Sequence, residues 1–182
     1  MNTESIAGTA AGRVWIRLVA RAMESRFRYR FFAPEKMLAG VDGLQGSVAL
    51  ELGCGTGFFT LPAARMIGDK GSLLAMDILQ ESVELVAKKV AAAGLENARV
   101  MKGDALATGL ENGGFTLVLL FGVVPAPMLP VSRLLPELHR VLKPGGILAV
   151  WPAVPGIARP ILRSGLFERT VKRNGVLNFK RL

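Results

Sequence analysis

The sequence predicts an α/β protein with a doubly wound, mostly parallel sheet of seven strands that ends in an antiparallel hairpin. Five apolar segments of strand length alternate with helical segments between residues 48 and 151. These segments are apolar throughout, which is typical of parallel strands covered by helices on both faces. Two further strand-like runs, 167–173 and 176–181, flank Asn174-Gly175, and Asn-Gly is a strong signal for a hairpin turn.

The individual elements follow from the apolar pattern and from turn residues. Parallel strands are expected at residues 48–52, 72–76, 98–102, 115–123 and 147–151. Helices are expected at residues 13–32, 58–67, 81–93 and 134–142, the last ended by Lys143-Pro-Gly-Gly146. In residues 81–93 the amphipathic spacing is carried by Val83, Val86, Ala87 and Val90. Gly94 suits the C-terminal cap of that helix.

Composition points to one folded domain. The chain has 182 residues, of which 51% are hydrophobic, and its mean hydropathy is +0.38. The longest apolar run, 115–131, is interrupted by prolines and is shorter than the roughly 20 residues of a membrane-spanning helix. Cys54 is the single cysteine, which excludes an intrachain disulfide and a metal site built on paired cysteines. We therefore expect a cytoplasmic protein without a transmembrane segment or a bound metal.

Positive charge is concentrated at the two ends of the chain. The formal net charge is +9; residues 1–36 hold seven Lys/Arg against three acids, and residues 159–182 hold seven against one. Such ends either attract anionic lipid, nucleic acid or an acidic partner, or keep an apolar protein in solution. We expect residues 1–36 to form a basic helical segment that packs on the domain as a lid or touches a membrane surface, and residues 37–182 to form the binding domain.

A glycine-rich turn follows the first parallel strand. The segment Glu51-Leu-Gly-Cys-Gly-Thr-Gly57 allows a tight turn and the close approach of a ligand to the backbone. The dinucleotide fingerprint requires a sixth-position glycine, but that position is Phe58 or Thr60, depending on the register. This departure counts against a nicotinamide oxidoreductase. Taken alone, the turn has a purely structural alternative.

Two aspartates end the next two strands. Asp77 stands 20 residues after Gly57, where a carboxylate can accept hydrogen bonds from both hydroxyls of a ribose. Asp104 follows the third strand, where it can accept a hydrogen bond from an adenine amino group. The alternatives are a helix cap for Asp77 and a turn residue for Asp104.

In combination these features closely resemble class I S-adenosylmethionine-dependent methyltransferases, which have a Rossmann-like fold. The segment ELGCGTGFFT (51–60) resembles their first motif, and Asp77 and Asp104 resemble the two nucleoside-side acids. The segment LHRVLKPGGI (138–147) resembles the small-molecule branch, which includes quinone-biosynthesis enzymes. The resemblance covers about residues 36–182 and implies S-adenosylmethionine as cofactor, with S-adenosylhomocysteine as its product.

The resemblance also implies a role for each matching residue on the methionine side of the cofactor. Gly53, Cys54 and Gly55 would line the methionine part through backbone groups. Glu51 would support the turn or meet the amino end of the methionine.

Six further positions match on the nucleoside and sulfonium sides. Asp77 would hold the ribose, with Ile78 against the adenine. Asp104 and Ala105 would flank the adenine, and the pair Phe121-Gly122 would lie near the sulfonium.

The acceptor is less constrained by the sequence. Phe121-Gly-Val-Val-Pro125 lacks the Asp/Asn-Pro-Pro-aromatic motif of enzymes that methylate base amino groups, so nucleic acid is not the expected substrate. Residues 122–130 are apolar and proline-rich, which favours an apolar or amphipathic small molecule.

No acid–base pair stands out, so the catalytic residue is unassigned. We expect His139 and Cys54 to serve packing, and Tyr29 either to orient the acceptor or to pack. The alternatives are a non-catalytic cofactor-binding or interaction protein, and an RNA methyltransferase suggested by the basic ends. The oligomeric state is expected to be a monomer or a homodimer.

Overall fold

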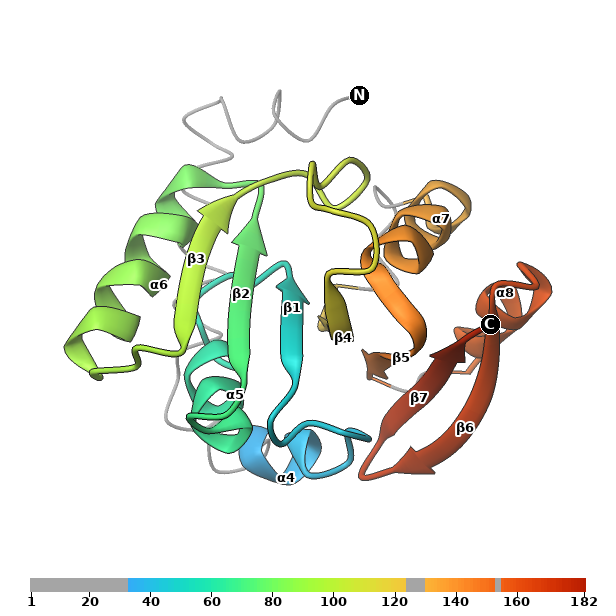
Figure 1. Cartoon of the computed structure of the whole chain (residues 1–182), viewed down its shortest axis with the longest axis horizontal. Helices are drawn as coiled ribbons and strands as arrows, with labels where there is room; N and C mark the ends of the chain where they lie inside the picture. Colours follow the sequence, from blue (N-terminus) through green and yellow to red (C-terminus); the bar gives the residue numbers. More distant parts are fainter. Residues whose placement is uncertain (1–32, 124–129, 153–154) are drawn as a thin grey trace.

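Seven strands form one sheet in the order β3-β2-β1-β4-β5-β7-β6 (Figure 1). The computed structural model describes residues 33–123, 130–152 and 155–182. The strands are β1 (Val48–Leu52), β2 (Ser72–Asp77), β3 (Ala98–Lys102), β4 (Phe115–Phe121), β5 (Leu142–Trp151), β6 (Phe167–Arg173) and β7 (Val176–Arg181). Strands β1 to β5 pair in parallel, whereas β7 is antiparallel to both β5 and β6. The expected fold class is confirmed.

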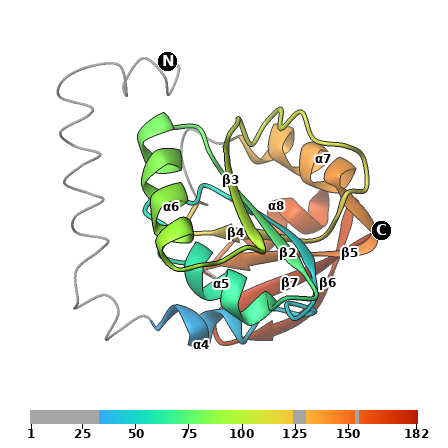
Figure 2. The same cartoon turned by 60° about the vertical axis from the view of Figure 1, so that its left-hand side comes forward.

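Helices cover both faces of this sheet. One face carries α4 (Pro34–Leu38), α5 (Thr60–Ile67) and α6 (Gln80–Ala92), and the other carries α7 (Val131–Val141) and α8 (Ala158–Arg163). Figure 2 shows α5 and α6 on one side of the strands and α7 on the other. Alternate residues of the central strands feed the two cores, because successive side chains on a strand point to opposite faces. On β4, for example, Leu117 and Leu119 face α5, and Val118 and Leu120 face α7.

Several element boundaries differ from the sequence-based expectation. Helix α5 begins at Thr60 rather than at residue 58, because the backbone is still in the turn as far as Phe59. Strand β4 ends at Phe121 rather than at residue 123, because Gly122 turns the chain with a φ of +72°.

Strand β5 begins earlier than expected, and one helical position is turned outward. Strand β5 starts at Leu142, which pairs with Phe115 before a register shift across the Lys-Pro-Gly-Gly segment. On α6, Val86 and Val90 are buried as expected, but Ala87 is exposed. The short helices α4 and α8 were not anticipated.

The predicted N-terminal helix at residues 13–32 lies outside the described residues. The expected boundary between residues 36 and 37 falls inside α4, whose Leu38 is fully buried in the core. Within the described ranges, no helix is both long enough and apolar enough to cross a membrane.

A buried asparagine joins the C-terminal hairpin to the segment before β1. Asn178 on β7 is 0% exposed. Its Oδ1 accepts the backbone N–H of Asp42 at 3.0 Å, and its Nδ2 donates to the carbonyls of Gly40 at 2.9 Å and Val171 at 3.3 Å. Both ends of the amide are therefore satisfied, as buried polar groups require. The hairpin turn follows the expected pattern, with positive φ at Asn174 and Gly175.

Candidate cofactor-binding site

The carboxyl ends of β1 to β4 meet at one edge of the sheet, where open α/β sheets bind ligands. The turn after β1 is fixed to the end of β2, because Gly53 and Cys54 both donate backbone N–H groups to the carbonyl of Met76, at 2.8 and 3.1 Å. The turn after β3 is fixed to the same strand, since Gly103 N–H donates to the carbonyl of Asp77 at 3.0 Å. The predicted site residues on the first three strands are thereby brought together.

The glycines of the turn serve different purposes. Gly53, Gly55 and Gly57 have φ values of +73°, +54° and +82°, which residues with a side chain rarely adopt. A Cβ atom on Gly57 would lie 3.3 Å from Leu61 and Val86, so this glycine permits the close packing of α5 and α6. Gly53 is instead exposed, and its backbone faces the edge where a ligand would bind.

Asp77 closes the other side of the turn. Its side chain accepts the backbone N–H of Gly55 on Oδ2 at 2.8 Å and that of Leu79 on Oδ1 at 3.0 Å. Burial raises the pKa of Asp77, and the hydrogen bonds from backbone N–H groups offset part of that rise. Because each carboxylate oxygen can accept more than one hydrogen bond, both oxygens retain acceptor capacity. The contact with Leu79 is a local turn contact. The N-cap of α6 is Leu79 itself, without a side-chain cap, so the structure does not show the helix-cap alternative for Asp77.

Glu51 is the most unusual residue of the site. It is 2% exposed, and its Oε2 has no hydrogen-bond partner. Burial raises its pKa to about 7, the Thr60 hydroxyl offsets part of the rise, and the nearby Asp77 carboxylate adds to it. Buried carboxylates without partners are costly. A cationic group placed beside Glu51 would remove that cost.

Two threonines extend this unsatisfied cluster. The hydroxyls of Thr56 and Thr60 are also buried without a hydrogen-bond partner of normal geometry. Together with Glu51 Oε2, they are the buried side-chain polar atoms without partners within the described parts of the chain. All three lie between residues 51 and 60, so unmet hydrogen-bonding capacity is confined to the glycine-rich turn. The sequence analysis did not single out either threonine.

Cys54 lies within the same turn, but its thiol is not a reactive nucleophile. It is 5% exposed and packs in the core cluster beneath the turn. Burial raises the pKa of its thiol, and the carboxylates of Glu51 and Asp77 raise it further. Because only the thiolate is a strong nucleophile, Cys54 stays protonated and serves packing.

The expected adenine side is built from less buried residues. Ile78 is half-buried directly after Asp77. Asp104 is exposed and accepts the backbone N–H of Leu106 at 2.8 Å, which is a turn contact, and Ala105 packs against the core beside α7. The structural alternative for Asp104 is therefore present, while its role toward adenine stays a prediction.

A partly exposed ion pair fixes the segment that carries Asp104. Glu137 on α7 accepts the backbone N–H of Thr108 at 2.8 Å and pairs with Arg140 at 2.7 Å. The hydrogen bond from Arg140 holds the pKa of Glu137 down, at about 2. Arg140 also donates to the carbonyl of Leu110 at 2.6 Å. The segment after β3 is thus anchored to α7 without a helix of its own.

An aromatic cluster supports the ends of β1, β4 and β5. Phe121 is 4% exposed and meets Phe59 edge-on, with ring centroids 5.0 Å apart. Phe59 also contacts Trp151 at 5.4 Å and Phe58 at 4.9 Å. The sequence pattern indicated Phe121 but not Phe58, Phe59 or Trp151. The pair Phe58-Phe59, directly after the glycine-rich turn, was a signal that could have identified two of them.

Other predicted residues lie elsewhere or outside the described ranges. His139 on α7 packs edge-on against Phe167, with ring centroids 5.9 Å apart, and so serves packing as expected. Gly122 is exposed just beyond β4. Tyr29 and residues 124–129 of the loop after β4 lie outside the described residues.

Comparisons with known proteins agree with this fold and with the glycine-rich turn and aspartates at the edge of the sheet. A family model described as a methyltransferase domain matches residues 49–146. The chain belongs to this family and is a class I, S-adenosylmethionine-dependent methyltransferase domain. Among curated relatives it is similar to a demethylmenaquinone methyltransferase of Lactobacillus johnsonii, with 30% identity over 135 residues. That match covers 73% of this chain and 52% of the relative, so the chain spans about half the length of the curated relatives it matches.

Other comparisons give the same fold. A demethylmenaquinone methyltransferase of Staphylococcus epidermidis is 34% identical over 105 residues, covering 57% of this chain and 42% of the relative. A solved SAM-dependent methyltransferase from Aquifex aeolicus has a TM-score of 0.72 at 22% identity, covering 89% of this chain and 95% of that one. The structural likeness concerns the fold alone.

The residues at the site fit S-adenosylmethionine. The ligand carries a positively charged amino group and a sulfonium, and the turn holds a buried carboxylate oxygen without a partner beside a second carboxylate. The ligand also carries ribose hydroxyls, and Asp77 has spare acceptor capacity. The backbone at Gly53 is exposed and carries no side chain that would hinder a ligand. Charge and hydrogen-bonding capacity therefore agree with this ligand.

Proposed function

We propose that this chain transfers a methyl group from S-adenosylmethionine to an apolar or amphipathic small molecule. The observation that carries the proposal is the buried Glu51 carboxylate, whose Oε2 has no hydrogen-bond partner, beside Asp77 at the glycine-rich turn. Two observations support a demethylated quinone or a similar apolar ring as acceptor: residues 122–130 are apolar, and the similar curated relatives are demethylmenaquinone methyltransferases.

In this proposal the cofactor is held by residues from four strand ends. The backbone of residues 53–55 would line the methionine part, and Glu51 would face its amino group. Asp77 would accept hydrogen bonds from the ribose hydroxyls. Ile78, Asp104 and Ala105 would border the adenine, and the pair Phe121-Gly122 would lie near the sulfonium.

The protein's contribution to chemistry is alignment and exclusion of water. When bound, S-adenosylmethionine supplies a methyl group that is already electrophilic. In this proposal the packed rings of Phe59, Phe121 and Trp151 would form an apolar floor beneath the reacting groups. Holding the acceptor in line is enough to accelerate such a transfer by several kcal/mol. Neither Cys54, which stays protonated, nor His139, which packs against Phe167, is suited to deprotonate the acceptor. An acceptor that ionises readily by itself, such as a hydroquinone, would need no such base.

The division of the chain is part of the same proposal. Residues 37–182 would form the cofactor-binding domain, and the basic segment 1–36 would cover the acceptor side. The helix α4 that links the two is fixed by Leu38 in the core.

Methyl transfer to defined acceptors tests the proposal. The full chain is incubated with S-adenosylmethionine and, in separate reactions, a short-chain demethylmenaquinone kept reduced, bulk RNA, and glycine as a polar small molecule. Formation of S-adenosylhomocysteine is measured. We expect product only with the apolar ring, and none with Asp77→Ala. Product with RNA alone would contradict the acceptor class, and tight cofactor binding without turnover on any acceptor would favour an interaction protein.

A second variant separates the acceptor side from the cofactor side. Met128 lies in the apolar loop after β4, outside the described residues. Met128→Asp should raise the KM for an apolar acceptor while S-adenosylhomocysteine binds as before. Equal losses of both would mean that the loop has a structural role instead.

A further inference from the structure

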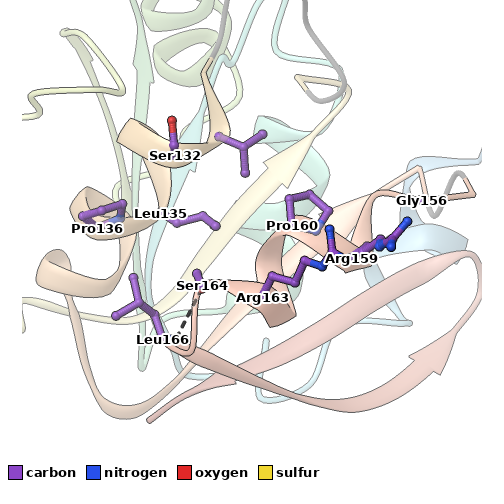
Figure 3. A pocket seen from close by; sticks show the side chains of 10 residues that line it. Ser132, Leu135, Pro136, Gly156, Arg159, Pro160, Arg163, Ser164 and Leu166 are labelled. Carbon is purple, nitrogen blue, oxygen red and sulfur yellow. Dashed lines mark hydrogen bonds between the residues drawn. The ribbon is translucent and has the colours of Figure 1, made fainter.

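A groove lies between α7 and α8, away from the glycine-rich turn. Its volume is about 570 Å³, within the range of ligand-binding pockets. Figure 3 shows its two walls: Ser132, Leu135 and Pro136 come from α7, and Arg159, Pro160 and Arg163 come from α8. The chain enters α7 from the loop after β4 and enters α8 from the segment after β5. Both walls therefore follow the carboxyl ends of the central strands.

The floor of the groove is apolar. Leu135 is 3% exposed and belongs to the core on this face of the sheet, and Val131 and Leu166 pack against the same core. Pro136 and Pro160 are exposed along the walls. Leu162, the neighbouring residue on α8, is 41% exposed and is one of few large hydrophobic side chains left in solvent among the described residues. Leu162 does not line the groove, but it places an exposed apolar side chain on the same short helix as Arg159 and Arg163.

The α8 wall is positively charged. Arg159 and Arg163 are exposed and four residues apart, so they lie on the same side of the helix. Neither forms an ion pair with a described residue, and the groove lining contains no Asp or Glu. The first turn of α7 also borders the groove, and the positive end of its dipole adds to the same potential. The site thus combines an apolar floor with two free guanidinium groups at its rim.

We propose that this groove docks the chain on a membrane by binding an anionic phospholipid. An acyl chain would lie on the floor formed by Val131, Leu135 and Leu166, and the lipid phosphate would pair with Arg159 and Arg163. Guanidinium groups pair with phosphate in a bidentate manner. A soluble anion would use the arginines but not the floor, and a neutral lipid would use the floor but not the arginines. The exposed Leu162 extends the contact in the direction of a bilayer surface.

Vesicle co-sedimentation of the full chain tests this proposal. Vesicles of phosphatidylcholine alone are compared with vesicles that contain phosphatidylglycerol. Arg159→Ala/Arg163→Ala removes two charges at the groove, and Arg65→Ala/Arg99→Ala removes two exposed charges at the far side as a matched control. We expect the wild type to bind phosphatidylglycerol vesicles, the groove variant to bind about tenfold more weakly or worse, and the control to change less than about threefold.

The apolar half of the site is tested separately. Leu162→Ser keeps every charge and should also weaken vesicle binding, while glycerol phosphate at millimolar concentration should not displace the vesicles. All variants should bind S-adenosylhomocysteine as the wild type does, so a failure here is distinct from a failure of the proposed methyl transfer. Absence of binding by the wild type, or equal losses in the groove and control variants, would overturn the proposal. Displacement by glycerol phosphate would assign the arginines to a soluble anion instead.

Discussion

Glu51 on β1 and Asn178 on β7 are both buried polar residues of the same sheet, yet their surroundings differ completely. Asn178 is 0% exposed, and its amide makes three hydrogen bonds to the backbone around it. Glu51 is 2% exposed, and its Oε2 makes none. Buried polar groups are almost always satisfied in native proteins. We therefore assign the satisfied residue to the fold, and we propose that the unsatisfied one marks the place where a ligand binds.

The backbone around the two residues shows the same contrast. Near Glu51, three glycines within five residues have positive φ, and one of them is exposed at the ligand edge. Near Asn178, the hydrogen bonds join strand β7 to the segment after α4 and leave nothing open. The unmet hydrogen bonds thus coincide with a glycine turn whose backbone is exposed at the ligand edge, as expected for a functional site.

The largest expected effect is on the pH dependence of stability. The folded protein holds the Glu51 proton up to a pKa of about 7, whereas an unfolded glutamate releases it near 4.5. Stability from this group is fully present below the unfolded pKa and is lost as the pH rises through 7, by roughly 3 kcal/mol. Urea unfolding at pH 5 and pH 8 measures this loss. Glu51→Gln should remove most of it, and an unchanged slope in that variant would contradict the assignment.

Asn178→Ala should be the next largest change and should act on folding alone. It leaves the Asp42 N–H and the carbonyls of Gly40 and Val171 without partners, at a cost of about 2–3 kcal/mol. Urea unfolding measures this loss, and calorimetry on the folded variant measures S-adenosylhomocysteine affinity. Affinity should stay within about twofold of the wild type. A large loss of affinity in an Asn178→Ala variant that is fully folded would contradict the claim that Asn178 acts on folding alone.

Gly53→Ala should weaken cofactor binding by about tenfold. The backbone has a φ of +73°, and the new Cβ would lie 2.7 Å from a methyl group of Val123. A non-glycine residue in this conformation costs about 1–2 kcal/mol, and relief of the strain would move the backbone that faces the ligand. Gly43→Ala is the matched control, because Gly43 has a φ of +66° with nothing within 4 Å of its Cβ position. Titration with S-adenosylhomocysteine should show a loss only for Gly53→Ala.

Glu51→Gln should weaken the binding of S-adenosylhomocysteine about tenfold at pH 8, a loss similar to that expected for Gly53→Ala. The amide keeps the shape of the side chain but loses the charge that faces the ligand's amino group, a loss of about 1.4 kcal/mol. At the same pH the variant should be more stable than the wild type, because it no longer buries an ionised carboxylate. Calorimetry and unfolding on the same preparation give both values, and reduced stability with unchanged affinity would assign Glu51 to the fold.

The sequence predicted those parts of the molecule that depend on local pattern. Strand β3 and the hairpin strands β6 and β7 have the expected bounds because apolar runs and Asn174-Gly175 determine them locally. The start of β5 was wrong because pairing with Phe115 on a neighbouring strand recruits Leu142 into the sheet despite the following Pro-Gly-Gly.

The site itself was only partly predictable for the same reason. Glu51, Asp77 and the glycines stand in a recognisable spacing, so they were found. The burial of the Thr56 and Thr60 hydroxyls depends on what the fold places around them, and no local pattern indicates it. The groove between α7 and α8 likewise depends on how two helices far apart in sequence pack.

Calorimetric titration of S-adenosylhomocysteine tests the central claim most directly, with NADH as a control ligand. Three proteins are compared: the wild type, Asp77→Ala, and Asn178→Ala as a destabilised variant with an intact site. We expect micromolar binding by the wild type and by Asn178→Ala, a loss of about 100-fold or more in Asp77→Ala, and no binding of NADH. Failure of well-folded wild type to bind S-adenosylhomocysteine, or equal binding by Asp77→Ala, would contradict the account.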